Sequence, residues 1–157
     1  MHLLRGKRNI KISMQTANAI SCELINIAKY VTMEFSSKPR SLNEIDCWKA
    51  TEFRTFLCYL RPLVLRSHLS PQQYHHFMLM HVAVTILSSN SMLNMYCDYA
   101  ENLLKEFVDQ MSELYGSTAV IYTIHSLIHV CDDVRRLGTL DEYSAFPFEN
   151  ALGMLKK

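Results

Sequence analysis

The apolar residues of this sequence recur at intervals of three and four over most of its length, and few residues interrupt the pattern. Only four glycines and four prolines occur among the 157 residues. This spacing places apolar side chains on one face of an α-helix, and so few helix breakers favour long helices with short connections. We therefore predict an all-α fold, a helical bundle of about five or six helices without a substantial sheet.

Local signals indicate where the first helices begin and end. Residues 17–31 carry one amphipathic stripe, and a break follows at residues 36–41. Ser41 and Glu44 have the spacing of a capping box, which predicts a helix start there. A second helix is expected from Trp48, with a kink or a stop and restart at Pro62.

The remaining helices are predicted in the same way. Ser70 followed by a proline is a helix start, and the serines near residue 88 end that helix. The next helix is expected to close at Gly116, with one apolar face made of Met92, Met95, Tyr96, Tyr99, Leu103, Phe107, Met111 and Leu114. A further helix is expected over residues 117–137, with a short strand at 119–123 as the alternative. A connector at 139–144 then leads to a last short helix from about Pro147.

The expected organisation is a basic tail and helical arm over residues 1–40, followed by a helical domain over residues 41–157. The core of the bundle is expected within residues 47–137. Five cysteines, widely spaced and without a CxxC pair, are predicted to be buried free thiols, which suits a reducing intracellular compartment.

Charge excludes one large class of function. Sixteen basic and fifteen acidic residues leave a net charge of +1, whereas a nucleic-acid groove relies on clustered Lys and Arg. The basic residues at positions 5–11 form the one exception, and a solvated chain end is favoured over a phosphate contact or an import signal. No apolar run approaches the roughly 18 residues of a membrane span, so we expect a soluble protein without a membrane partner.

His125 and His129 are the first candidate metal ligands. Four residues apart on a helix, they share a face, and Asp132 or Asp133 follows one turn later. That arrangement can bind zinc, although the general base of an H-E-x-x-H motif is absent. Two histidines hydrogen-bonded within the bundle are the favoured alternative. The same interpretation, surface or interhelical hydrogen bonding, is favoured for His75, His76 and His81.

Glu149 is the candidate acid near the end of the chain. It lies between aromatic residues and the start of the last predicted helix. The favoured interpretation is a carboxylate stabilised by the helix dipole. The alternative is a divalent-cation ligand beside the two-histidine helix.

Four segments together carry a family resemblance. They are residues 38–45 (KPRSLNEI), 47–57 (CWKATEFRTFL), 125–138 (HSLIHVCDDVRRLG) and 146–157 (FPFENALGMLKK). In this order they resemble the C-terminal region of animal transposase-like proteins related to CACTA (En/Spm-like) DNA transposons. The last two are also similar to the plant CACTA-associated domain of unknown function. The resemblance covers roughly residues 15–157.

The resemblance implies a parent protein that cuts and joins DNA. Its RNase H-like core would hold divalent metal (Mg or Mn) on two Asp and one Glu, and the metal would activate the attacking oxygen. Glu149 matches the position of the third acid, and His125 and His129 match a paired-histidine feature without an assigned role. The two Asp have no counterpart here, Ala151 replaces an aromatic residue of the pattern, and the family continues past Lys157 with further basic residues.

Three functions therefore fit the sequence. The first is a transposon-derived fragment, the helical C-terminal part of a DNA transposase-like protein, truncated relative to the family and without catalytic activity or a cofactor of its own. Such a protein would contact DNA through its parent, act in the nucleus and use no small-molecule substrate. The alternatives are a helical protein-protein interaction or oligomerisation module, such as a homo-oligomer, and a small zinc-bound structural domain.

Overall fold

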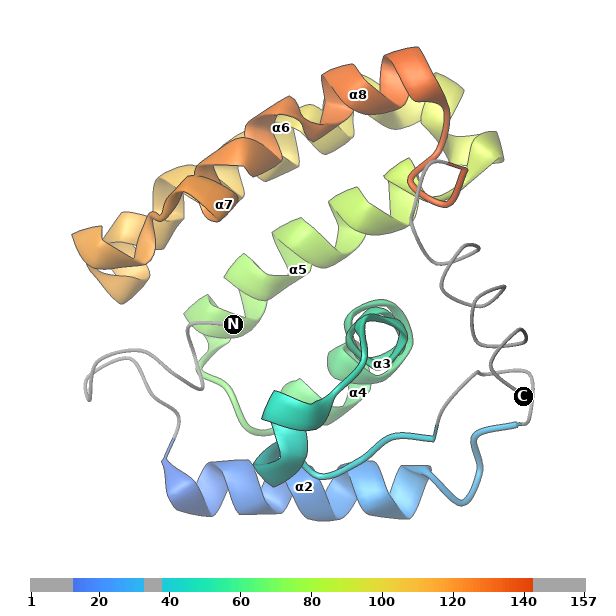
Figure 1. Cartoon of the computed structure of the whole chain (residues 1–157). Helices are drawn as coiled ribbons and strands as arrows, with labels where there is room; N and C mark the ends of the chain where they lie inside the picture. The colour runs from blue at the N-terminus through green and yellow to red at the C-terminus, as the bar shows by residue number, and fades with distance from the viewer. Residues whose placement is uncertain (1–12, 33–37, 143–157) are drawn as a thin grey trace.

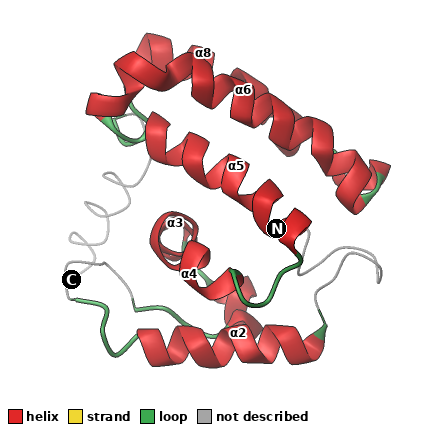
Figure 2. Ribbon diagram, turned by 180° about the vertical axis from the view of Figure 1, so that it is seen from behind, coloured by secondary structure: helices red, strands yellow, loops and turns green. Residues whose placement is uncertain are grey.

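The structure, a computed structural model, describes residues 13–32 and 38–142 of the chain. Within these two ranges every regular element is a helix (Figure 2), which confirms the predicted all-α fold. The basic residues at positions 5–11, the helix expected from Pro147 and the candidate acid Glu149 lie outside the described residues.

The first half of the chain forms one long helix and a run of short helical segments. These are α2 (Met14–Ile27), the 3-10 helix η1 (Leu42–Cys47), α3 (Ala50–Thr55), the π-helical turn η2 (Phe56–Leu60) and α4 (Arg61–Leu65). The second half begins with two long helices and continues in shorter pieces. These are α5 (Pro71–Leu87), α6 (Asn90–Tyr115), η3 (Ser117–Ala119), α7 (Tyr122–His125), η4 (Ser126–His129) and α8 (Val130–Leu137).

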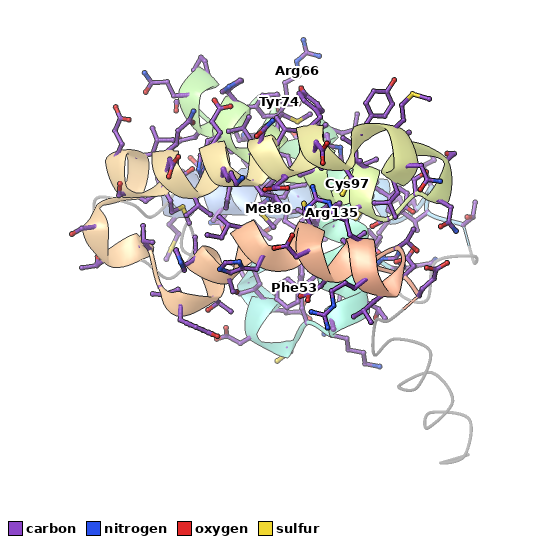
Figure 3. The ribbon with its side chains drawn as sticks, turned by 90° about the horizontal axis from the view of Figure 1, so that it is seen from above. Phe53, Arg66, Tyr74, Met80, Cys97 and Arg135 are labelled. Carbon is purple, nitrogen blue, oxygen red and sulfur yellow. The ribbon has the colours of Figure 1, made fainter. Side chains whose placement is uncertain are left out.

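The helices stack in layers around α5 (Figure 1). Helix α6 packs along α5 after a short connection, and the segment from η4 to α8 packs on α6. Figure 3 shows α6 and the α7–α8 segment side by side. On the other side of α5 lie α3 and α4, and α2 covers the far side of α4 (Figure 1).

The apolar residues gather in two cores. The α5–α6 core joins α5, α6 and α8 and contains the fully buried Leu87, Leu104 and Cys131. The α2–α4 core joins α2, η1 and the α3–α4 segment around Ile20, Leu24 and Val64. The buried core therefore extends beyond the expected residues 47–137, because α2 contributes two of its most deeply buried side chains.

The segment around Pro62 stays helical by widening one turn. Proline has no N–H to donate, and its ring clashes with the carbonyl four residues earlier. The chain responds with the π-helical turn at Phe56–Leu60, in which the Arg61 N–H reaches the carbonyl of Phe56. The expected kink or stop is thus a π turn followed directly by α4.

Both predicted helix starts are confirmed, since Ser70 caps α5 and Ser41 caps η1, but their caps differ. At Ser70 the capping box is present, because the Ser70 hydroxyl accepts from Gln73 N–H at 3.3 Å and Gln73 Oε1 accepts from Ser70 N–H at 3.3 Å. At Ser41 the prediction of a capping box is wrong. The Ser41 hydroxyl accepts from Asn43 N–H, and the Glu44 side chain turns to Arg40 at 3.3 Å.

The segment from residue 117 to 137 differs from the single helix predicted. It breaks into η3, α7, η4 and α8, and residues 120 and 121 have no regular structure. The strand alternative at 119–123 is also wrong, since α7 begins at Tyr122. Gly116 and Gly138 end α6 and α8 with φ of 83° and 92°, as the sequence predicted for helix-terminating glycines.

The predicted apolar face of α6 is buried over only part of its length. Leu103, Phe107 and Met111 lie in the α5–α6 core as expected. The other end is exposed, with Met92 41%, Met95 72%, Tyr96 46% and Tyr99 54% accessible. No helix in the described ranges combines the length and the apolar character needed to cross a membrane.

The cysteines are free, as predicted, but most are not buried. Cys131 is buried and Cys58 and Cys97 are partly buried, whereas Cys22 and Cys47 are exposed. Cys22 and Cys47 fall on outward positions of α2 and η1, where apolar neighbours in sequence do not imply burial.

Candidate functional site

The two histidines of the predicted metal site lie near each other at the surface. His125 ends α7 and His129 ends the 3-10 turn η4, and both side chains are exposed. Their ring centroids are 6.0 Å apart with an interplanar angle of 77°. The pairing expected from their spacing is therefore present, but the favoured interpretation of two histidines hydrogen-bonded inside the bundle does not fit this exposure.

The acids that follow the pair are arranged for ion pairing. Arg135 donates to Asp132 at 3.1 Å, and its other terminal nitrogen donates to Asp98 and Glu101 of α6 at 2.6 Å each. These contacts fasten α8 to α6 and raise the pKa of Arg135, with the Glu101 hydrogen bond as the main cause. Asp132 thus faces a guanidinium rather than completing a ligand set.

No three His, Cys, Asp or Glu side chains within residues 13–32 and 38–142 are grouped so that they could hold a metal ion. The sets His125–His129–Asp132 and His125–His129–Asp133 are therefore not formed. A set that includes Glu149 stays a prediction, because Glu149 lies outside the described residues.

Removing both histidines is expected to leave the stability of the chain almost unchanged. The double change His125→Ala, His129→Ala removes exposed side chains, so the free energy of unfolding should shift by less than about 0.5 kcal/mol. The measurement is thermal unfolding with and without added zinc, alongside metal analysis of the purified chain. Stoichiometric zinc that disappears in the double variant would contradict this expectation.

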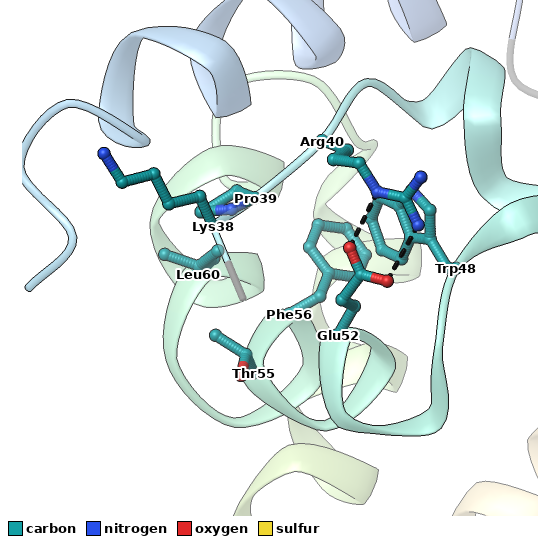
Figure 4. Close-up of a pocket in the computed structure, with 8 residues that line it drawn as sticks. All are labelled: Lys38, Pro39, Arg40, Trp48, Glu52, Thr55, Phe56 and Leu60. Carbon is teal, nitrogen blue, oxygen red and sulfur yellow. Dashed lines mark hydrogen bonds and ion pairs between the residues drawn. The ribbon is translucent and has the colours of Figure 1, made fainter. Parts of the chain in front are cut away.

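The best-formed polar site lies where residue 40 meets η1 and α3. Arg40 donates from Nε to one oxygen of Glu52 at 2.7 Å and from a terminal nitrogen to the other oxygen at 2.8 Å (Figure 4). The same guanidinium donates to the Cys47 carbonyl at 2.7 Å, and the Lys49 N–H donates to Glu52 at 2.7 Å. Glu52 is 8% exposed, so this is a nearly buried carboxylate with all its contacts formed.

The hollow beside this ion pair is too small for a substrate. It is lined by residues 38–40, Trp48 and the side chains of Glu52, Thr55, Phe56 and Leu60 (Figure 4). The interior space is about 10 Å³, enough for roughly one water molecule. The hydrogen bond from Arg40 holds the pKa of Glu52 below its usual value of 4.5. An ionised and fully engaged carboxylate is suited to joining elements and not to proton transfer.

Sequence reasoning missed the roles of Arg40 and Glu52. Twelve residues separate them, so no helical or strand spacing links the two. The available signal was indirect: each lies in one of the first two segments that carry the family resemblance. Arg135 and Asp98 are 37 residues apart in sequence, so local spacing could not predict their ion pair either.

A third polar group is buried in the α5–α6 core. His76 is 2% exposed, stacks on Phe107 with centroids 4.3 Å apart, and donates from Nε2 to the Phe107 carbonyl at 2.8 Å. His81 likewise contacts the Leu57 carbonyl through Nδ1 at 3.0 Å. Interhelical hydrogen bonding, the favoured interpretation for His76 and His81, is therefore confirmed.

Stability is expected to fall as pH decreases below neutrality because of His76. Burial lowers the pKa of His76 from 6.5, against a smaller opposing effect of its hydrogen bond to Phe107. The unfolded chain therefore binds a proton that the folded chain excludes, and stability present above pH 6.5 is lost as pH falls towards the lower folded pKa. Urea unfolding at pH 7.5 and 5.5 should show a smaller loss in His76→Gln than in the exposed control His75→Gln. Equal losses in both variants would contradict the assignment.

Comparison of the chain with models of known protein families finds no match. The comparison with curated proteins likewise gives no match, and the comparison with solved structures finds none either.

Proposed function

We propose that this chain is a helical, non-catalytic part of a DNA transposase-like protein. The observation that supports the proposal best is the joint between two of the segments that carry the resemblance. Residues 38–45 and 47–57 contact each other through Arg40, which binds the carboxylate of Glu52 and the carbonyl of Cys47. If the residues of these segments serve only to position one another, the segments can keep the family's pattern without forming a substrate site.

The third segment fits the same role. Residues 125–138 cover α6 through η4 and α8, and Cys131 and Val134 fill the α5–α6 core. The Arg135 ion pairs add a polar connection along the same contact. In this proposal the segment builds the fold, and DNA cleavage belongs to a sheet-bearing core that supplies two Asp.

In this proposal Glu149 is a catalytic acid only in the complete parent protein. Two-metal chemistry needs several carboxylates around the ions, and the described part of this chain has no such cluster. In a complete parent protein, Glu149→Gln should abolish strand cleavage with Mg²⁺ or Mn²⁺ and leave DNA binding intact. The control is Glu113→Gln, an exposed acid of α6. Cleavage by the Glu149→Gln parent at the normal rate would refute the assignment.

A second candidate function, a homo-oligomerisation module, rests on a different observation. Met92, Met95, Tyr96 and Tyr99 form an exposed α6 apolar stripe. Asp98 is the one charged residue between positions 90 and 99, and Arg135 neutralises it at 2.6 Å. Two copies of the stripe could therefore pair without bringing unpaired like charges together.

Sedimentation of the purified chain tests this candidate. The wild-type chain is expected to form a dimer below about 100 µM, and the double change Met95→Lys, Tyr99→Lys should give a monomer. The control Ile25→Lys alters an exposed apolar residue of α2 and should leave the dimer intact. A monomeric wild-type chain, or a dimer unaffected by the double change, would exclude the stripe as the interface.

A further inference from the structure

Arg61 is a partly buried cation without an anionic partner in the described part of the chain. It begins α4, and its Nε is buried with no hydrogen-bond partner. No hydrogen bond or ion pair links any of its nitrogens to residues 13–32 or 38–142. By contrast, Arg40, Arg54 and Arg135 each form an ion pair with a carboxylate.

Two aromatic rings lie close to this guanidinium. The Arg61 Cζ lies 4.5 Å from the centroid of Phe77 and 5.5 Å from that of Phe56. Such cation–π contacts stabilise the charge. They do not replace the hydrogen bonds that the N–H donors of the guanidinium can form. The donors remain available to a ligand that approaches edge-on.

Burial makes the missing partner costly. It lowers the pKa of Arg61 to about 10, so the side chain is still charged at neutral pH. A buried charge without a counter-ion loses hydration that protein contacts have to replace. The side chain keeps part of its surface accessible, and Nε is its only nitrogen that is buried without a partner, so a solute can reach the terminal nitrogens.

Tyr115 supplies a second donor at the same place. It ends α6, is 4% exposed, and its hydroxyl has no hydrogen bond with the residues that the structure describes. Arg61 and Tyr115 are close enough for each to influence the ionisation of the other. The Tyr115 ring also packs against His76, with centroids 5.2 Å apart, which fixes it in the core.

The position of this pair in the fold is also distinctive. Phe56 belongs to the α2–α4 core and Tyr115 to the α5–α6 core. Arg61 therefore lies between the two cores, where a bound ion would connect α4, α5 and the end of α6.

We propose that Arg61 and Tyr115 form a binding site for a small phosphate-type oxyanion between the two cores. A carboxylate has two oxygens, which the guanidinium alone would satisfy. A phosphate carries further oxygens for the Tyr115 hydroxyl, so it uses both donors. The phosphates of duplex DNA have the same chemistry, but a duplex is too wide to enter between helices. The inference is independent of the proposed function.

The test is the thermal unfolding midpoint of the full chain at pH 7.5 as inorganic phosphate replaces chloride at constant ionic strength. A specific site gives a rise that saturates, whereas the general stabilisation by phosphate rises without saturation and is common to all variants. The wild-type chain is expected to show the saturable rise. Tyr115→Phe should bind phosphate on the order of tenfold more weakly, and Arg61→Met should lose the saturable rise.

Matched variants keep the result interpretable. Arg66→Met removes an exposed arginine (Figure 3) and should respond like the wild-type chain. If Arg61→Met does not fold, Arg61→Lys keeps the cation without the planar fork and should bind at least about tenfold more weakly. No saturable rise in the wild-type chain, or the same rise in an Arg61 variant, would overturn the proposal. So would a response to a short DNA duplex in place of inorganic phosphate.

Discussion

Leu24→Ala is expected to lower the free energy of unfolding by roughly 3 kcal/mol, the largest effect of any single change considered for this chain. Leu24 is fully buried in the α2–α4 core. Its truncation removes apolar area and leaves a cavity between α2 and the α3–α4 segment. Urea unfolding followed by circular dichroism measures the change.

The neighbouring residue provides the control for this prediction. Ile25 is 51% exposed on the same helix, so Ile25→Ala should change the free energy of unfolding by no more than about 0.5 kcal/mol. A small loss for both variants would mean that α2 is an accessory arm. A large loss for Leu24→Ala alone would establish that α2 belongs to the core.

Arg40→Ala is expected to lower the free energy of unfolding clearly, although by less than Leu24→Ala, because Arg40 itself is partly exposed. The change leaves the nearly buried carboxylate of Glu52 with the Lys49 N–H as its remaining donor and frees the Cys47 carbonyl. Arg66→Ala, an exposed arginine without such contacts, should shift stability by less than about 0.5 kcal/mol. Equal effects of the two changes would show that the Arg40–Glu52 joint is dispensable.

The same joint has a predicted pH signature. The pKa of Glu52 is lowered from 4.5, mainly by the hydrogen bond from Arg40. Its contribution to stability is therefore present above about pH 4.5 and is lost as the pH falls through the lower folded pKa. Glu52→Gln should flatten this part of the acid unfolding profile. An unchanged acid limb in that variant would contradict the role of Glu52.

Periodicity predicted the helical class and several boundaries because those depend on nearby residues. Ser70, Gly116 and Gly138 act through their own backbone or the next turn, and all three end or begin helices as expected. Periodicity cannot tell which apolar face finds a partner. Met95 and Leu103 fall on one predicted stripe of α6, yet Met95 is exposed and Leu103 is buried because the partner helices cover only part of the stripe.

The polar sites were predicted less well for a related physical reason. His125 and His129 are four residues apart, so their proximity follows from local geometry. Arg40 meets Glu52, and Arg61 meets Phe77, only after the chain has folded. Local spacing also did not predict the partner of Asp132, which pairs with Arg135 and not with the histidines. Long-range partners of this kind are set by packing, and a single sequence does not display them.

The proposal that this chain is part of a transposase-like protein is tested most directly by sequencing full-length transcripts that contain its coding region. We expect the open reading frame to extend upstream into a segment with strand-forming sequence and two Asp residues suited to bind divalent metal. A basic segment should follow Lys157 in the same frame. Transcripts in which the frame encodes these 157 residues alone would contradict the proposal and favour the interaction module.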